Sequence, residues 1–113
     1  MVLKIGEKLH IMTRRAFETD LRRHFVGVVK KAGENVARVE DYVFVLDTRS
    51  SQYVRKPETR TIIIPLTDAR YIINVIPPST KIDKVTYLTE GDNLLVTDGR
   101  HFKLEISEFG AHF

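Results

Sequence analysis

Apolar and polar residues alternate along much of this chain with a period of two, which is typical of β-strands that bury one face. In residues 8–13, Leu9 and Ile11 alternate with His10 and Met12. The alternation is longest in residues 36–47, which predict a long and bent strand. Within residues 42–46 both faces are apolar or aromatic, as expected where a strand crosses the middle of a strongly curved sheet.

Shorter apolar or β-branched segments predict further strands. These segments are residues 24–29, 53–54, 61–64, 71–76, 85–88, 94–97 and 102–106. Between them, Lys56-Pro57-Glu58 and Asp98-Gly99 have the residue types of turns. In residues 14–23 the apolar residues recur at near-helical spacing, and Thr13 is available as an N-cap, so one or two helical turns are predicted there.

This order of elements predicts a mainly β protein. We expect one domain over residues 1–113, in which residues 9–77 form a small, strongly bent β-barrel and residues 79–113 add a C-terminal β-hairpin extension. At most one short N-terminal helix accompanies the barrel. The only candidate joint in the chain is Pro77-Pro78-Ser79, and no repeat of 20–50 residues is present.

The strand order over about residues 9–77 resembles that of Sm-like small β-barrel domains. The resemblance lies in His24-Phe25-Val26-Gly27-Val28-Val29, the bent segment 36–47 and the closing segments 61–64 and 71–76, with Gly27 and Asp47 at the family's glycine and aspartate positions. Where the family has an Arg-Gly-type turn, this chain has Thr67-Asp68-Ala69-Arg70. The resemblance implies a module that pairs edge strands into homo-oligomers and often binds RNA.

Composition adds limits to this prediction. The chain has 113 residues, of which 42% are hydrophobic and 29% charged, so one ordinary globular core is expected. It contains no cysteine, which excludes disulfides and thiolate metal sites. The longest apolar runs are far shorter than the roughly 20 residues that span a bilayer, and the N-terminal residues form no signal peptide. We therefore expect a cytoplasmic protein with no membrane partner.

Positive charge is concentrated in the first half of the sequence. Residues 1–60 carry a net charge of +5 and residues 61–113 a net charge of −2. Clustered cations beside aromatic residues are what phosphates and unstacked bases require. The candidate nucleic-acid-binding residues are Arg14, Arg15, Arg22, Arg23, Arg49, Tyr53, Arg55, Lys56 and Arg60. The alternative is a solvated surface on which carboxylates neutralise these cations.

Other chemistry finds little support in the sequence. The four histidines, of which His24 is expected at the surface or at a barrel edge, lack the spacing of zinc ligands. No nucleophile elbow, phosphate-binding loop or dinucleotide fingerprint is present, so no enzyme activity, metal or cofactor is expected.

The isoleucine-rich segments 61–64 and 71–76 leave two possibilities open. Their side chains either fill the core or lie at an exposed strand edge that pairs with a second subunit, because proline follows each segment. Two functions follow from the sequence as a whole. One is a non-catalytic module that binds RNA or another polyanion through its basic half, and the other is a homo-oligomeric protein-interaction or scaffold domain.

Overall fold

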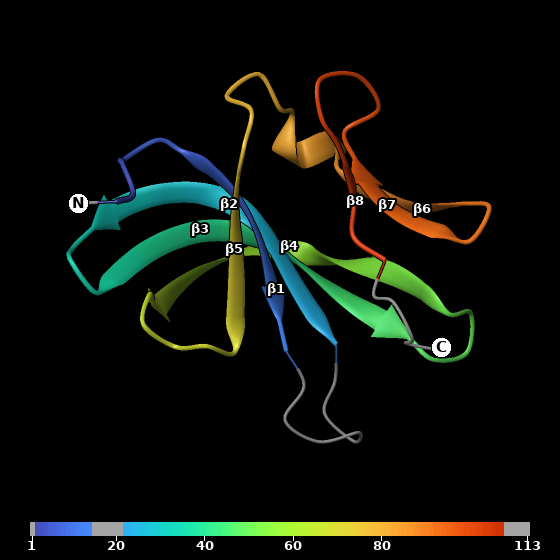
Figure 1. Cartoon of the computed structure of the whole chain (residues 1–113), viewed down its shortest axis with the longest axis horizontal. Coiled ribbons are helices and arrows are strands. Elements are labelled where there is room, and N and C mark those ends of the chain that lie inside the picture. Colours follow the sequence, from blue (N-terminus) through green and yellow to red (C-terminus); the bar gives the residue numbers. More distant parts are fainter. Residues whose placement is uncertain (1, 15–21, 108–113) are drawn as a thin grey trace.

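Two antiparallel β-sheets make up the protein in the computed structural model, which describes residues 2–14 and 22–107 (Figure 1). The larger sheet has the strand order β4-β3-β2-β1-β5 and the smaller sheet the order β6-β7-β8. The strands are β1 (Lys8–Thr13), β2 (Arg23–Ala32), β3 (Val36–Asp47), β4 (Gln52–Pro65), β5 (Tyr71–Ile76), β6 (Thr86–Glu90), β7 (Asn93–Thr97) and β8 (Lys103–Glu105). A single 3-10 turn, η1 (Ile82–Lys84), leads into β6.

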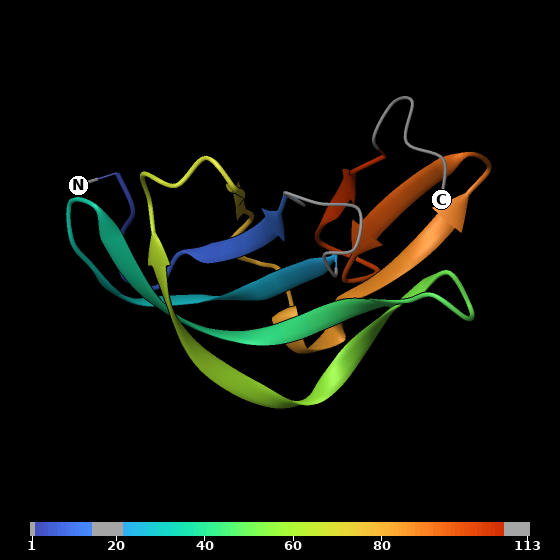
Figure 2. The same ribbon diagram turned by 90° about the horizontal axis from the view of Figure 1, so that it is seen from below.

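The mainly β prediction is confirmed, but the closed barrel is wrong for the described residues. Strands β4 and β5 are the outer strands of the larger sheet and do not pair with each other. Figure 2 shows this sheet curving into an open trough, with the smaller sheet at one end. The larger sheet is therefore curved but open, and the smaller sheet packs on the face opposite the inside of its bend.

The helix predicted for residues 14–23 lies mostly outside the described residues, because the structure does not describe residues 15–21. Arg14 is in no regular element, Arg23 begins β2, and no α-helix occurs in the described chain.

Strand β4 corrects the prediction of two short strands separated by a turn at Lys56-Pro57-Glu58. The segment is one strand of 14 residues, and these three residues form a bulge inside it. Phe44 on β3 lies opposite Arg55, whereas Tyr42 lies opposite Thr59, so three β4 residues match a single β3 residue. An edge strand tolerates proline because the missing N–H is not needed by a further strand.

The C-terminal extension is a three-stranded sheet rather than a hairpin. The Asp98-Gly99 turn is confirmed, although it belongs to a five-residue connection from β7 to β8. The carboxylate of Asp98 accepts hydrogen bonds from the backbone N–H groups of Arg100, His101 and Phe102, and Gly99 has a φ of 86°. A side-chain acceptor thus holds the connection where a two-residue turn was expected.

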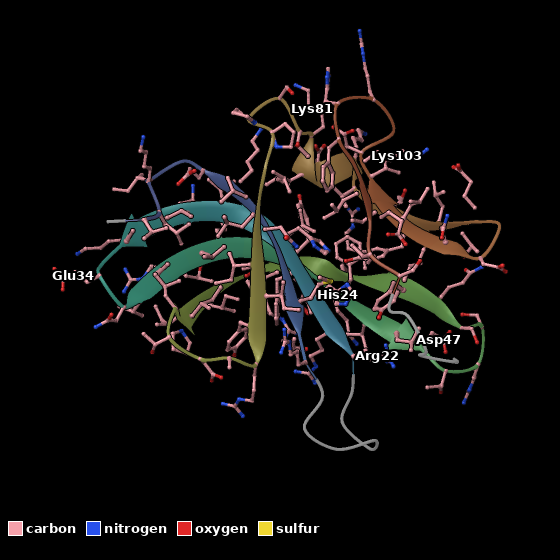
Figure 3. The ribbon with its side chains drawn as sticks, in the orientation of Figure 1. Arg22, His24, Glu34, Asp47, Lys81 and Lys103 are labelled. Atoms are coloured by element: carbon pink, nitrogen blue, oxygen red, sulfur yellow. The ribbon has the colours of Figure 1, made fainter. Side chains whose placement is uncertain are left out.

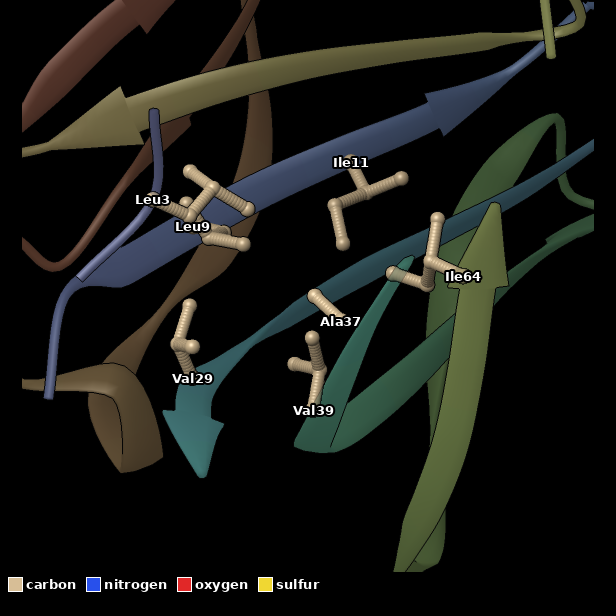
Figure 4. Packing of buried hydrophobic residues seen from close by; sticks show 7 residues of the cluster. All are labelled: Leu3, Leu9, Ile11, Val29, Ala37, Val39 and Ile64. Atoms are coloured by element: carbon tan, nitrogen blue, oxygen red, sulfur yellow. The ribbon is translucent and has the colours of Figure 1, made fainter. Parts of the chain in front are cut away.

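Hydrophobic residues gather on both faces of the larger sheet. One cluster lies inside its bend and includes Leu9, Ile11, Val39 and Ile64 (Figure 4). The other lies between the two sheets and consists of Val26, Phe44, Ile76, Val85, Val96 and Phe102. Residues 42–46 of β3 are buried or half-buried on both faces, which confirms the prediction made for them.

Candidate functional site

The contact between the two sheets contains a polar cluster of three side chains, which we call the histidine–tyrosine cluster. His10 on β1 and His24 on β2 belong to the larger sheet, and Tyr87 on β6 belongs to the smaller one. The Tyr87 hydroxyl lies 2.8 Å from His10 Nε2 and 2.7 Å from His24 Nδ1, so both rings form hydrogen bonds with one oxygen. The cluster is a direct polar link between the sheets.

Burial sets the protonation of this cluster. His10 is fully buried, and His24 is 7% exposed on β2, the central strand of the larger sheet, which corrects the prediction that His24 lies at the surface or at a barrel edge. Desolvation lowers the pKa of His10 to about 4, and desolvation together with the charges of His10 and Arg22 lowers that of His24 to about 3. Burial also raises the pKa of Tyr87. All three side chains are therefore neutral at pH 7.

Tyr53 on β4 stacks on this cluster from the outside. Its ring centroid lies 4.6 Å from that of His24 and 4.7 Å from that of Tyr87, with an interplanar angle of 25° in both pairs. The His24 and Tyr87 centroids are only 5.4 Å apart, whereas rings on opposite faces of Tyr53 would be separated by roughly 9 Å at normal stacking distances. Both rings therefore lie on the same side of Tyr53.

Two open depressions meet at Tyr53, and we call them together the Tyr53 cleft. The first has a volume of about 410 Å³ and is lined by Phe44, Tyr53, Tyr87, Arg55 and residues 83–86. The second has a volume of about 490 Å³ and lies toward the β6–β7 turn. Its lining combines the apolar side chains of Leu46 and Leu94 with polar and charged ones, among them Arg22 and Asp92. In Figure 3, Arg22 lies close to His24 at the start of β2.

Arg55 is held in place at the first depression by two contacts. Its guanidinium carbon lies 4.8 Å above the centre of the Tyr42 ring, and its Nη1 donates a hydrogen bond to the backbone oxygen of Asp83 at 2.7 Å. The first contact is a cation–π interaction within the larger sheet, and the second reaches the segment that precedes the smaller sheet. The positive charge of Arg55 is thereby positioned beside the aromatic side chains.

The structure brings some of the predicted nucleic-acid-binding residues together and separates others. Tyr53, Arg55 and Arg22 line the Tyr53 cleft. The exposed side chains of Arg14, Arg23, Arg49, Lys56 and Arg60 are distributed over the end of β1, the start of β2, the β3–β4 turn and strand β4. Arg15 lies outside the described residues.

Sequence reasoning missed the roles of His10 and Tyr87. The two residues are 77 positions apart and meet only when the smaller sheet packs on the larger one. The sequence feature that could have pointed to His10 is its position within an alternating strand, between the core residues Leu9 and Ile11. Alternation placed it on the polar face, and the second sheet then buried that face.

No group of three or more histidine, aspartate or glutamate side chains in residues 2–14 and 22–107 could hold a metal ion. In the same residues, no helix is long and apolar enough to cross a membrane.

The fold and the site together define a small, mainly β protein with an aromatic, cation-flanked cleft between two antiparallel sheets. Comparison with protein-family models, with curated proteins and with solved structures finds no match to this chain.

Proposed function

We propose that this protein is a non-catalytic module that binds single-stranded RNA in the Tyr53 cleft. The observation that carries the proposal is the position of Tyr53, which lines both depressions and has Arg55 at one of them and Arg22 at the other. An aromatic ring between two cationic side chains suits single-stranded RNA, because one base can stack on the ring while the phosphates on either side of it contact the cations.

The size and chemistry of the cleft support this proposal. Each depression falls within the range of about 300–1,000 Å³ that is usual for ligand sites. The fixed guanidinium of Arg55 provides hydrogen-bond donors for a phosphate, and Thr48, Ser51 and Asn93 provide neutral polar groups. A cleft of this kind binds a flexible single strand better than a duplex, because bases reach the ring only when they are unstacked.

The test is a titration of the protein with a mixed-sequence single-stranded RNA at two salt concentrations. Each phosphate neutralised on a single strand contributes about −0.7 to the slope of log affinity against log salt. The double variant Arg22→Ala, Arg55→Ala is therefore expected to bind more weakly and to flatten the slope by about 1.4. Replacement of Tyr53 by Ala should weaken binding about 5- to 150-fold without changing the slope.

Two controls make this test specific. Tyr53→Phe keeps the ring and should keep most of the affinity. Lys30→Ala combined with Lys31→Ala removes two exposed charges from the far end of β2 and should leave the slope unchanged. An absence of binding at low salt, or equal binding by the Arg22, Arg55 double variant, would refute the proposal.

A second candidate function is self-association as a scaffold, and strand β4 favours it. This 14-residue strand is an outer strand of the larger sheet, and most of its residues are exposed. Val54 and Ile63 on β4 are 51% and 57% exposed. A long edge strand with exposed aliphatic side chains is a template for pairing with another strand.

A further inference from the structure

The second depression of the Tyr53 cleft lies between two chain reversals that are distant in the sequence. Thr48 and Ser51 line it from the β3–β4 turn, and Asp92 and Asn93 line it from the tip of the β6–β7 hairpin. Figures 1 and 2 show both reversals at the same end of the molecule. The Tyr53 ring is part of the same lining. A base that stacks on Tyr53 therefore has polar side chains from both sheets around it.

These polar side chains have unused hydrogen-bonding capacity. In residues 2–14 and 22–107, four side chains that line the depression form no hydrogen bond or ion pair, namely those of Thr48, Ser51, Asp92 and Asn93. By contrast, the hydroxyl of Ser107 accepts a hydrogen bond from the backbone N–H of Leu94. A base that enters the depression can bind the four side chains without breaking a contact inside the protein.

Asp92 distinguishes this depression from a general phosphate site. It is the only carboxylate among the described residues that line the depression. A carboxylate repels phosphates, but its two oxygens accept hydrogen bonds from N–H donors, and such charge-assisted bonds are roughly twice as strong as neutral ones. Asp92 is thus suited to a base edge with adjacent N–H groups rather than to the RNA backbone.

The four bases differ in the donors on their Watson–Crick edges. Guanine carries N–H groups at both N1 and N2, next to the acceptor O6, whereas adenine, cytosine and uracil each carry N–H donors at one atom of this edge. Asn93 follows Asp92 in the sequence and lines the same depression, and its side-chain amide can donate to O6. The two side chains together complement guanine.

We propose that the second depression selects a guanine base of the bound RNA. The Asp92 carboxylate accepts hydrogen bonds from guanine N1–H and N2–H, and the Asn93 side-chain amide donates one to O6. Leu46 and Leu94 supply apolar contact surface for the base. This inference rests on the proposed binding of single-stranded RNA in the Tyr53 cleft and adds the base specificity of that site.

The probes are four fluorescein-labelled RNAs of seven nucleotides, each a uridine strand with guanine, adenine, cytosine or uracil at its centre. They are titrated with the full chain and followed by anisotropy. The guanine strand should bind roughly tenfold more tightly than the other three, as expected for one bidentate pair between a side chain and a base.

Two modified bases test which edge is read without changing the protein. Hypoxanthine in place of guanine lacks the N2 amino group and should lose most of the preference. 7-Deazaguanine keeps the Watson–Crick edge and should bind as guanine does. Weak binding of the 7-deazaguanine strand together with tight binding of the hypoxanthine strand would overturn the proposal, because N7 would then be the recognised atom.

Two matched variants localise the selection. Asp92→Asn should lose the preference for guanine, and its affinity for the uracil strand should not fall, because only a charge that repels phosphate is removed. Asp83→Asn makes the same substitution at the first depression and should keep the preference.

The outcomes separate this inference from the proposed function. Equal binding of the four RNAs by the natural chain, or a guanine preference that survives in Asp92→Asn, would overturn the inference and leave RNA binding intact. Loss of the preference in Asp83→Asn as well would indicate a general effect of charge and would also overturn it. Failure of all four RNAs to bind at low salt would refute the proposed function, and the inference with it.

Discussion

At the scale of single residues, the Tyr87 hydroxyl has two functions, because it is the hydrogen-bond partner of two buried nitrogens. Tyr87→Phe leaves His10 Nε2 and His24 Nδ1 without that partner and keeps the ring packing. Each buried polar group left unpaired costs about 1–3 kcal/mol, so we expect a loss of about 3 kcal/mol in the free energy of unfolding.

Urea denaturation measures this loss. Tyr42→Phe is the control. The Tyr42 ring packs against the hydrophobic cluster between the two sheets, and its hydroxyl has no hydrogen bond among the described residues. We expect a change below about 0.5 kcal/mol for it. Equal stabilities of the two variants would show that the shared hydroxyl contributes nothing.

Asp41 on β3 is a second buried group with consequences for stability. Its side chain is 1% exposed, and neither carboxylate oxygen has a hydrogen-bond partner among the described residues. Burial raises the pKa of Asp41 from 3.8 to about 7, although the charge of Arg60 on the neighbouring strand opposes the shift. The folded chain therefore keeps a proton that the unfolded chain has already released between pH 3.8 and pH 7.

The contribution of Asp41 to stability therefore falls as the pH rises through that window. Asp41→Asn removes the titration, so its free energy of unfolding relative to the natural chain should increase steadily from pH 4 to pH 7. The measurement is urea denaturation at several pH values, and a constant difference for Asp41→Asn would contradict the assignment.

The two histidines act in the opposite direction. Their folded pKa values of about 4 and about 3 lie below the ordinary 6.5, so the unfolded chain binds more protons below pH 6.5. The stability that they contribute is present above pH 6.5 and is lost as the pH falls toward 4. Between pH 4 and 6.5 two histidines oppose one aspartate, and stability should rise with pH there.

At the scale of elements, the pairing of β2 with β3 depends on Gly27. A Cβ atom added at Gly27 would lie 2.6 Å from the Cβ of Asp41, its partner across the two strands. Gly27→Ala therefore forces the strands apart, and we expect a loss of about 1–3 kcal/mol.

The matched control is Gly33→Ala in the β2–β3 turn, where the nearest atom would lie 3.6 Å away, at an ordinary contact distance. Thermal unfolding of both variants compares them directly. A melting temperature for Gly27→Ala that equals that of Gly33→Ala would contradict the close approach of the two strands.

Strand β4 illustrates which elements could be predicted from the sequence. Strands β1 and β3 follow from local alternation and β5 from a β-branched segment, and neither pattern needs information from distant residues. In β4, local turn chemistry at residues 56–58 favoured a break, but pairing with β3 on both sides of the bulge kept the strand continuous. Pairing between strands thus determined that β4 is continuous. Whether the larger sheet closes also depends on contacts between distant strands, which local patterns do not encode.

The candidate site was predictable to the same extent. Tyr53 and Arg55 are only two positions apart, so the sequence itself shows an aromatic ring beside a cation. The histidine–tyrosine cluster depends on how the smaller sheet packs on the larger one. No local pattern encodes that packing, so His10 and Tyr87 could not be paired beforehand.

At the scale of the whole molecule, the long outer strand β4 predicts self-association. Light scattering after gel filtration should give a mass above the 13.0 kDa of one chain. Ile63→Lys places a charge on this edge and should lower the mass toward that of a monomer, whereas Lys30→Met, on strand β2 that does not pair with β4, should not. A monomeric natural chain at high micromolar concentration would exclude the scaffold function.

The shared hydroxyl of Tyr87 has a consequence for the positions of protons in the cluster. The hydroxyl carries one hydrogen atom, so it donates to one histidine and accepts from the N–H of the other. The imidazoles of His10 and His24 are thus held in a linked choice of tautomer, because the bare nitrogen of one requires the protonated nitrogen of the other. A change of tautomer at one ring reverses the hydroxyl and must change the other ring as well, so the contact between the two sheets has two proton arrangements that interchange as a unit.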